Sequence, residues 1–353
     1  MTDDARKSFR IGPATVGDGS PVYVIAEAGV NHDGRVDVAR ELIHAAANAE
    51  ADAVKFQLFS ADRLVTKSAA TADYQKQASQ GDTQRDMLAR LELAREQFAE
   101  LSAYARYCDI EFLATPFGID DLKFLVSIGV QAIKLASTDI VNDPLLDAAV
   151  ASGLPVIAST GAASEAEIAR AVERFKQPGA GPLALLHCVS CYPTPEAQAN
   201  LGAIGALARR FDCLTGFSDH TESVSMGGYA AAAGARIIEK HLTLDRSRPG
   251  PDHAFSLEPT AMAEYIRQIR YVERLLGDGS VGSQECEDEV RRLARGNIVS
   301  TRDIRAGEVL NAEMLTIKRA GGGLWASELQ TIIGRRAKVD IPADTAIQRE
   351  WVS

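Results

Sequence analysis

Eight short apolar runs with the composition of β-strands recur along the chain, and each is followed by a stretch with the spacing of an amphipathic helix. Alternating units of this kind form either a doubly wound sheet or a closed barrel. Eight regular units over about residues 21–276 favour the (β/α)8 TIM barrel, which typically needs roughly 250 residues. The runs are Val22–Ala26, Ala53–Phe59, Ile110–Ala114, Ala132–Ala136, Val156–Ser159, Leu183–His187, Leu214–Ser218 and Arg236–His241.

Segments outside these units predict further parts of the fold. Residues 1–20 contain two short apolar runs and a turn signal at Asp18-Gly19, so we expect an N-terminal hairpin that covers the bottom of the barrel. Residues 277–294 have the composition of a linker, and residues 295–353 that of a small domain of short strands and glycine turns. The long polar connection at 60–95 falls on the active-site side, which predicts a lid or substrate loop.

Composition excludes several classes of protein. The net charge is −10 and no long Lys/Arg run is present, so nucleic acid is not an expected partner. No apolar run reaches the roughly 18–20 residues of a membrane span, so no membrane partner is expected either. The five cysteines are an odd, scattered set, which indicates a reducing compartment and predicts a cytoplasmic protein. We interpret Cys188 and Cys191 as reduced packing residues.

Two histidines, His220 and His241, each end a predicted strand, and a helical stretch separates them. Neighbouring parallel strands of a barrel bring their carboxyl ends side by side at the rim where active sites form. Imidazoles in that arrangement can share one metal ion. The alternative is that each is a buried, hydrogen-bonded core histidine.

Lysines and hydroxyl groups occur at the ends of the other strands. By strand alternation Lys55 and Lys134 face the barrel interior, where an unpaired ammonium group is too costly to be accidental. Together with Thr115, Ser137 and Ser159 they predict an anion site, with phosphate as the expected anion. Gly161 supports this prediction, because it precedes a helix that begins with a capping box at Ser164–Glu167. Glu27 ends the first strand, where it either pairs with a lysine or acts in catalysis.

Distinctive motifs extend over nearly the whole chain. Those of the barrel are Ile25–Gly34, Ala53–Gln57, Phe112–Phe117, Ile133–Ser137, Ser159–Gly161, His187–Cys188, Tyr192–Pro195, Gly216–Thr221, Glu239–His241 and Arg248–His253. Together they resemble the sialic acid synthase family. The tail, with Ile304–Leu310 and Ile317–Arg319, is similar to the β-clip, antifreeze-like SAF domain that follows the barrel in that family.

This resemblance implies an activity. It is the condensation of phosphoenolpyruvate with an N-acetylated amino sugar of the N-acetylmannosamine type and water, which gives a nine-carbon 2-keto sugar acid of the N-acetylneuraminate type and phosphate. The near alternative is a legionaminic acid synthase, which uses a 2,4-diacetamido-6-deoxy sugar by the same mechanism. A non-catalytic binding protein and an ice-binding tail are further alternatives, and the intact set of polar strand-end residues argues against both.

The resemblance also implies roles for individual residues. His220 and His241 bind a divalent ion, Mn2+ or Mg2+, and Glu27 is the acid/base group. Arg319 reaches the sugar's N-acetyl group across a domain-swapped homodimer. Phosphoenolpyruvate is held by Lys55, Thr115, Lys134, Ser137 and Ser159, and the sugar is contacted by Gln57, Asp139, Tyr192 and Asp252. Ser190 is a further substrate-binding residue.

Three positions depart from the family pattern. Position 139 is Asp where synthases specific for N-acetylmannosamine often have Glu, and Ser190 stands where some have Asn. The shorter carboxylate leaves the identity of the sugar open. The tail has Lys318-Arg319-Ala320-Gly321 instead of Lys-Arg-Pro-Gly, and alanine does not restrict the backbone as proline does.

Overall fold

The computed structural model describes residues 7–67 and 83–353, and the chain divides into two compact units between Gly277 and Asp278. Within the described part of the first unit, eight parallel strands are hydrogen-bonded in the order β5-β4-β3-β10-β9-β8-β7-β6, and β5 adjoins β6. The sheet therefore nearly closes, which confirms the predicted (β/α)8 barrel. The strands are β3 (Tyr23–Gly29), β4 (Ala53–Leu58), β5 (Glu111–Pro116), β6 (Ile133–Leu135), β7 (Val156–Ser159), β8 (Leu183–Cys188), β9 (Leu214–Asp219) and β10 (Ile237–His241).

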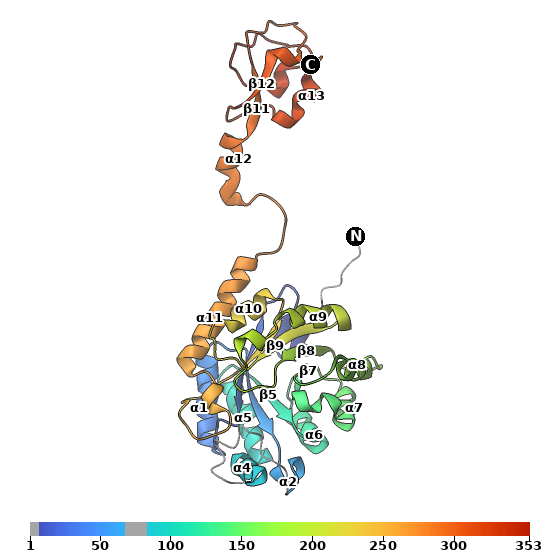
Figure 1. Cartoon of the computed structure of the whole chain (residues 1–353), viewed down its shortest axis with the longest axis vertical. Coiled ribbons are helices and arrows are strands. Elements are labelled where there is room, and N and C mark those ends of the chain that lie inside the picture. Colours follow the sequence, from blue (N-terminus) through green and yellow to red (C-terminus); the bar gives the residue numbers. More distant parts are fainter. Residues whose placement is uncertain (1–6, 68–82) are drawn as a thin grey trace. The chain divides into compact units, whose positions relative to one another are not determined.

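The helices that connect the strands lie around the barrel (Figure 1). Each buries one apolar face against the sheet; in α11, for example, Met262, Tyr265, Ile266 and Ile269 follow helical spacing. Helix α8 begins with the predicted capping box, in which the Ser164 amide donates to Glu167 Oε2 at 2.7 Å. The connecting helices are α1 (Val36–Asn48), α5 (Arg95–Tyr107), α6 (Ile119–Ser127), α7 (Asp143–Ala151), α8 (Glu165–Arg174), α9 (Gly202–Phe211), α10 (Met226–Ala232) and α11 (Pro259–Leu276).

Several strands extend beyond their predicted carboxyl ends. Strand β3 continues past Ala26 to Gly29, with a register shift between Glu27 and Gly29, and β5 continues through Thr115. The apolar runs end earlier because the last residues of these strands are polar. Strand alternation continues through them, so Glu27 shares the inner face with Tyr23 and Ile25.

The amino-terminal half of the barrel interior is apolar. The side chains of Tyr23, Ile25, Leu113 and Ile157 pack there with other strand residues. A hairpin of β1 (Ser8–Ile11) and β2 (Ala14–Gly17) adds Ile11 and Val16 to the same cluster, at the end of the barrel opposite the carboxyl ends of the strands. Its turn is at Gly12-Pro13, because Asp18-Gly19 follow the second strand of the hairpin instead of joining the two. Residues 1–6 of the predicted hairpin segment lie outside the described residues.

The connection after β4 differs from its prediction as a polar loop. Its described parts contain two short helices, α2 (Ala61–Leu64) and α4 (Gln84–Leu91), and a small apolar cluster that includes Met87 and Leu91. The sequence predicted a polar loop because this connection has few apolar residues. In α4 the buried ones, Met87 and Leu91, lie on one face of the helix. Residues 68–82 of the expected lid lie outside the described residues.

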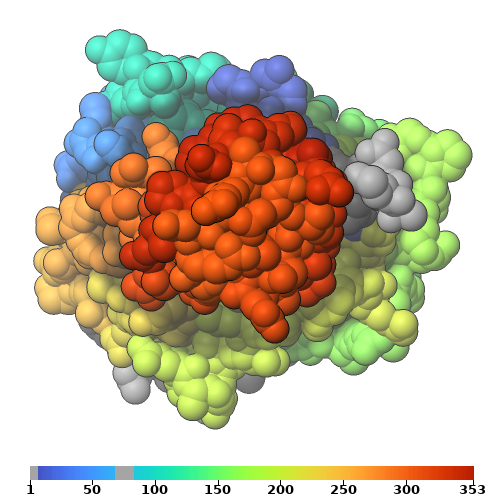
Figure 2. All heavy atoms as spheres, turned by 90° about the horizontal axis from the view of Figure 1, so that it is seen from above, coloured from blue at the N-terminus to red at the C-terminus, as the bar shows by residue number. Residues whose placement is uncertain are grey.

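The second unit begins with two short helices, η4 (Glu285–Glu287) and α12 (Asp288–Ala294), in the predicted linker segment. Strands β11 (Gly296–Ser300) and β12 (Leu315–Arg319) then pair antiparallel, and a helical turn α13 (Leu329–Ile332) follows. This part forms a small closed body, orange to red in Figure 2, with its own core. The core side chains are Ile298, Ile304, Leu310, Leu315, Leu324, Ile332, Ala337, Ile341, Ile347 and Val352.

The described residues include no helix of the length and apolar character that a membrane crossing requires. All five cysteines are free.

Candidate active site

A cavity of about 570 Å³ opens at the carboxyl ends of the barrel strands. Side chains from all eight strands or the loops that follow them reach it, as expected for a barrel whose active site is built at this end. Most of the residues singled out from the sequence line the cavity: Glu27, Lys55, Gln57, Thr115, Lys134, Ser137, Ser159, Ser190, Tyr192, His220, His241 and Asp252.

A layer of buried charges forms the floor of this cavity. Lys55 Nζ lies 3.2 Å from Glu27 Oε2 and 3.0 Å from Glu239 Oε2. Lys134 Nζ lies 3.5 Å from Glu239 Oε1, so Glu239 stands between the two lysines. The lysines therefore bind carboxylates in the ligand-free protein, and a bound anion has to share them.

Glu239 is a site residue that the sequence analysis missed. It precedes His241 by two residues on β10, so it points to the same inner face of the barrel. The two-residue spacing from His241 could have identified Glu239 as a site residue. In the sequence, the motif Glu239–His241 was noted only for its histidine. Ser218 Oγ on the neighbouring strand donates to Glu239 Oε1 at 2.9 Å, which holds the carboxylate in place.

The two carboxyl groups of the layer differ in pKa. Burial, opposed by the charge of Lys55, raises the pKa of Glu27 to about 7. For Glu239 the effect of burial is outweighed by Lys134 and Lys55, which hold its pKa far below the usual range. Glu239 is therefore a permanent counterion, whereas Glu27 can hold or release a proton near neutral pH.

The two lysines also differ in the direction of their pKa shifts. Burial lowers the pKa of Lys134, even though Glu239 opposes that effect. For Lys55 the two carboxylates Glu239 and Glu27 outweigh burial and raise the pKa. Hydroxyl groups complete the coordination of both ammonium groups, because Lys134 Nζ donates to Ser159 Oγ at 2.8 Å and Lys55 Nζ to Thr115 Oγ1 at 3.3 Å.

Hydroxyl groups line the cavity beside Lys134, where a glycine lets them approach one another. The Gly161 amide donates to Ser137 Oγ at 3.0 Å. A Cβ at position 161 would collide with Ser190 Oγ and would lie only 2.8 Å from Ser137 Oγ. Only glycine fits between these two serines, which therefore approach each other at the cavity.

The two histidines face each other across the ends of β9 and β10. Their ring centroids are 5.5 Å apart, a separation that one ion with metal–nitrogen bonds of about 2 Å can bridge. His220 Nδ1 donates to the Val189 carbonyl at 3.0 Å, which leaves the lone pair of its other ring nitrogen available. His241 Nδ1 is buried without a hydrogen-bond partner among the described residues, and Asp252 Oδ2 lies 3.8 Å away.

Aromatic rings surround this histidine pair. The Tyr192 ring lies 4.3 Å from that of His220, and the Phe255 ring lies 5.0 Å from that of His241. No group of three or more His, Cys, Asp or Glu side chains is arranged to hold a metal within residues 7–67 and 83–353. The residues present thus fit an open site with two protein ligands, and they do not fit a closed structural site with four.

Cys188 is a free and buried thiol, as interpreted from the sequence, and it also lines the cavity, with its Sγ 3.8 Å from His220 Nδ1. It reaches the inner face because it is the last residue of β8 and follows the alternation of Ala184 and Leu186. Cys191 is free but exposed, so its interpretation as a packing residue was wrong.

A second buried ion pair lies on the outer face of the same strand ends. Lys240 Nζ is 3.2 Å from Asp219 Oδ2, and both side chains are completely buried. Tyr265 OH on α11 donates to the same carboxylate at 2.8 Å. Because Asp219 precedes His220 and Lys240 precedes His241, this pair fixes the backbone beside both histidines; its members were also not singled out from the sequence.

Asp139, one of the predicted sugar-binding residues, does not line the cavity. Asp139 lies in the short helical turn η1 (Ser137–Val141), where its Oδ1 accepts from Asn142 Nδ2 at 2.9 Å. Its Oδ2 is buried without a partner among the described residues, and burial raises the pKa of this carboxyl group. Arg319 is exposed at the end of β12 in the second unit.

Comparisons with known proteins agree with this architecture. The NeuB family model matches residues 42–281 and the SAF domain model residues 297–350. The N,N'-diacetyllegionaminic acid synthase of Legionella pneumophila is 39% identical over 341 residues, which cover 95% of this chain and 96% of that protein. The N-acetylneuraminate-9-phosphate synthase of Mus musculus is 32% identical over 341 residues, covering 96% of this chain and 94% of that protein.

A solved structure is also similar. The crystal structure of an N-acetylneuraminic acid synthetase from Leptospira borgpetersenii, in complex with citrate, matches with a TM-score of 0.74 and 37% sequence identity. The match covers 81% of this chain and 96% of that chain.

The barrel with its charged cavity, the SAF domain and the named relatives together define an enzyme of the sugar-acid synthase class. The chain belongs to the NeuB family, and the resemblance found in the sequence is confirmed.

Proposed function

We propose that this enzyme condenses phosphoenolpyruvate with an N-acetylated amino sugar and water to give a nine-carbon 2-keto sugar acid and phosphate. The observation that most supports this proposal is the placement of Lys55, Lys134, Glu27 and both histidines around one cavity. The lysines and hydroxyl groups offer charge-assisted donors to a phosphate and a carboxylate. The relatives named as synthases of legionaminic acid and of N-acetylneuraminate 9-phosphate support the same chemistry.

The proposed reaction balances without a redox partner. Carbon 3 of phosphoenolpyruvate attacks the aldehyde carbon of the open-chain sugar, the new carbon–carbon bond forms, and the aldehyde oxygen takes a proton from Glu27. Water then adds to the oxocarbenium ion left at carbon 2 and returns a proton to Glu27. The carbon–oxygen bond to phosphate breaks, phosphate leaves with the proton of the new hydroxyl group, and the ketone remains.

We propose that Lys134, Ser137 and Ser159 hold the phosphate, while Lys55 and Thr115 hold the carboxylate end of phosphoenolpyruvate. Lys55 also contacts Glu27, so it keeps the acid/base group beside the reacting carbons. Gln57 Nε2 donates to Glu27 Oε1 at 2.9 Å and restricts the rotation of the carboxyl group. Glu27 is thus positioned from two sides before substrate enters.

His220 and His241 would hold a divalent ion, Mn2+ or Mg2+, at this site. When bound, such an ion supplies Lewis-acid polarisation of the sugar aldehyde. Tyr192 and Phe255 shield the histidines from bulk water, which strengthens polar interactions with the substrate. Asp252 lies beside His241 and lines the cavity, which supports its assignment to the sugar.

One wall of the cavity favours a deoxy sugar over N-acetylmannosamine. Apolar side chains form this wall, and they come from the β3 and β5 loops and from the connection after β4. A 2,4-diacetamido-6-deoxy sugar brings an additional acetamido methyl and a methyl at carbon 6, whose burial is favourable by about 0.8 kcal/mol per carbon. Burial of a carbon-6 hydroxyl against these apolar side chains would instead cost free energy of desolvation. The wall consists of Val30, Phe59, Leu64, Val65, Leu88, Leu91 and Phe117.

Phosphate release from a panel of amino sugars tests this proposal. The enzyme is incubated with phosphoenolpyruvate, Mn2+ and either N-acetylmannosamine or a 2,4-diacetamido-6-deoxy sugar, with and without chelator. We expect metal-dependent release with both classes of sugar. The kcat/KM should be at least about tenfold higher for the deoxy sugar, because one or two additional buried methyl groups typically change kcat/KM by that factor. Release from none of the sugars would disprove the synthase proposal. A preference for N-acetylmannosamine would disprove the role of the apolar wall.

We further propose that two copies of the chain form a domain-swapped dimer in which Arg319 of one copy contacts the sugar held by the barrel of the other. Its exposed guanidinium group and its place at the end of β12 support this role. An Arg319→Ala variant mixed with a barrel-inactive His241→Ala variant should regain activity, because mixed dimers contain one complete site. The two variants are co-expressed so that dimers with one copy of each can form. Activity no higher than that of each variant alone would exclude a shared site.

A further inference from the structure

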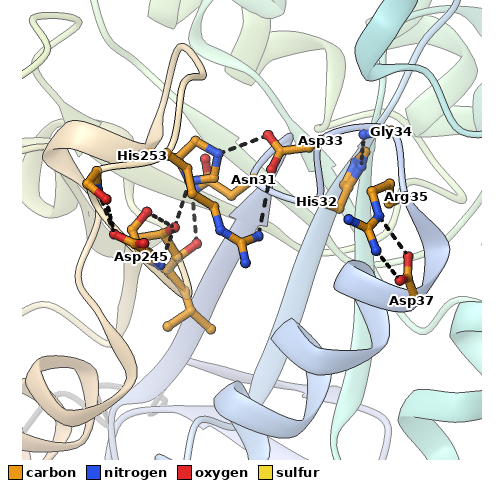
Figure 3. A network of polar contacts seen from close by, with 12 residues as sticks. Asn31, His32, Asp33, Gly34, Arg35, Asp37, Asp245 and His253 are labelled. Atoms are coloured by element: carbon orange, nitrogen blue, oxygen red, sulfur yellow. Dashed lines mark hydrogen bonds and ion pairs between the residues drawn. The ribbon is translucent and has the colours of Figure 1, made fainter.

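The turn after the first barrel strand contacts the loop after the last barrel strand through a set of buried polar groups (Figure 3). Asn31 Nδ2 donates both to the Leu242 carbonyl and to Ser256 Oγ, each at 2.9 Å. Ser256 Oγ in turn donates to the Asp252 carbonyl at 2.6 Å. Asn31 thus reaches the main chain of Asp252 through a single hydroxyl group.

A second connection holds the residue that follows Asp252. His253 Nε2 lies 3.0 Å from Asp33 Oδ1, and its Nδ1 lies 2.7 Å from Thr243 Oγ1 (Figure 3). Since a carboxylate only accepts, Nε2 donates to Asp33, and both ring nitrogens of this buried imidazole are satisfied. Gly250 lets the loop fold tightly over the ring, because a Cβ there would lie 2.5 Å from the His253 ring.

These contacts lie on both sides of a cavity residue. Asp252 is buried, lines the cavity and has its Oδ2 3.8 Å from His241 Nδ1. The backbone of Gly29, in the register shift of β3, approaches the same carboxylate. A Cβ at position 29 would lie 3.4 Å from Asp252 Oδ2, 3.2 Å from Glu27 Oε1 and 3.3 Å from Gln57 Nε2. The first strand and its turn therefore define the position of Asp252 relative to the acid/base group.

We propose that Asn31, Asp33 and His253 are positioning residues that hold Asp252 in the orientation in which it binds the sugar. This inference rests on the proposed function for the role of Asp252. Backbone hydrogen bonds hold the ends of the loop of residues 242–256, where Leu242 bridges to Leu257. Between them the only helix or strand is η3 (His253–Phe255), so side-chain contacts contribute to the conformation of this part. A displaced loop moves Asp252 but leaves the lysines and hydroxyl groups on the barrel strands in place. The loss of these contacts should therefore affect the sugar and not phosphoenolpyruvate.

Steady-state kinetics of variants at these positioning residues test this role. Asn31→Ala and Asp33→Ala are expected to lower kcat/KM for the sugar by roughly tenfold to 100-fold, the cost of a misplacement near 1 Å, with KM for phosphoenolpyruvate changed less than about twofold. In an Asp252→Ala background the same substitutions should cost almost nothing further, because they act through Asp252. Asp33→Asn, whose amide oxygen still accepts from His253, should retain most of the activity.

A control and a second readout separate positioning from general loss of structure. Asp37 lies in the same segment and pairs with Arg35 at the surface, without a contact to residues 242–256 among the described residues (Figure 3). Asp37→Ala should leave the kinetics unchanged. Hydrogen exchange of residues 248–256 should accelerate in Asn31→Ala and Asp33→Ala and not in Asp37→Ala.

Two results would overturn this inference. Equal losses for both substrates, or a full loss that persists in the Asp252→Ala background, would show that the contacts do not act through Asp252. Unchanged hydrogen exchange of the loop in both variants would show that the contacts do not hold it. The exchange measurement needs no substrate. It therefore tests whether Asn31 and Asp33 hold the loop of residues 242–256 even where the phosphate-release assay disproves the proposed reaction.

Discussion

A Glu239→Gln variant is expected to lose about 3–5 kcal/mol of unfolding free energy, because removal of one partner leaves buried charges without compensation. Glu239 is the counterion of both Lys55 and Lys134, and all three side chains are almost completely buried. Glutamine keeps the size and the hydrogen bond from Ser218 but removes the charge. The loss is measured by urea unfolding of the ligand-free protein.

The control for this variant is Glu222→Gln. Glu222 pairs with Arg246 at the surface, where such an ion pair contributes about 0–1 kcal/mol. A change below about 1 kcal/mol for Glu239→Gln itself would contradict its role as the shared counterion.

A His241→Ala variant is expected to lose metal-dependent turnover while remaining folded. Even the loss of a residue that only orients a metal ligand costs about 10-fold to 100-fold in affinity or activity, so loss of a ligand should cost at least about 100-fold. The buried Nδ1 of His241 has no hydrogen-bond partner among the described residues, so removal of the ring leaves no polar group unpaired there. Binding of Mn2+ is measured directly from the signal of free Mn2+ in electron paramagnetic resonance, and folding by circular dichroism.

His44→Ala is the matched histidine control. His44 is a surface residue whose Nε2 contacts Tyr104 OH at 2.6 Å, and it does not line the cavity. This variant should bind Mn2+ as the unmodified protein does. Persistence of full Mn2+ binding and turnover in His241→Ala would refute the ligand role of His241.

Much of the fold and part of the site followed from one-dimensional patterns. Eight apolar runs at regular intervals predicted the barrel, and strand alternation predicted that Lys55 and Lys134 face inward. Both predictions depend on periods of two and 3.6 residues, which are local properties of the chain. The predicted strand ends were less accurate, because an apolar run ends where the polar cavity begins, although the strand itself continues.

The parts of the site that were missed depend on contacts between distant segments. Glu239 is one carboxylate among many in the sequence, and only the register of β10 against β9 and β3 places it between two lysines. The place of Cys188 at the cavity has the same cause, since it depends on where β8 ends. Asp139 differs from these residues, because it was assigned a role from the resemblance and does not line the cavity. Its carboxylate accepts a hydrogen bond from Asn142 instead.

The sequence by itself determined the barrel, the SAF domain and the set of residue types at the strand ends, because these depend on local periodicity and on motifs that persist along the chain. The tertiary structure decided which of these charges compensate one another, which wall of the cavity is apolar, and how the Asn31–Gly34 turn meets the loop of residues 242–256. These are properties of side chains separated by up to about two hundred residues, and no local pattern encodes the distance between them. The histidine pair His220 and His241 was visible as two strand ends. The buried ion pair behind it, Asp219 with Lys240, became visible only once the two strands lay side by side.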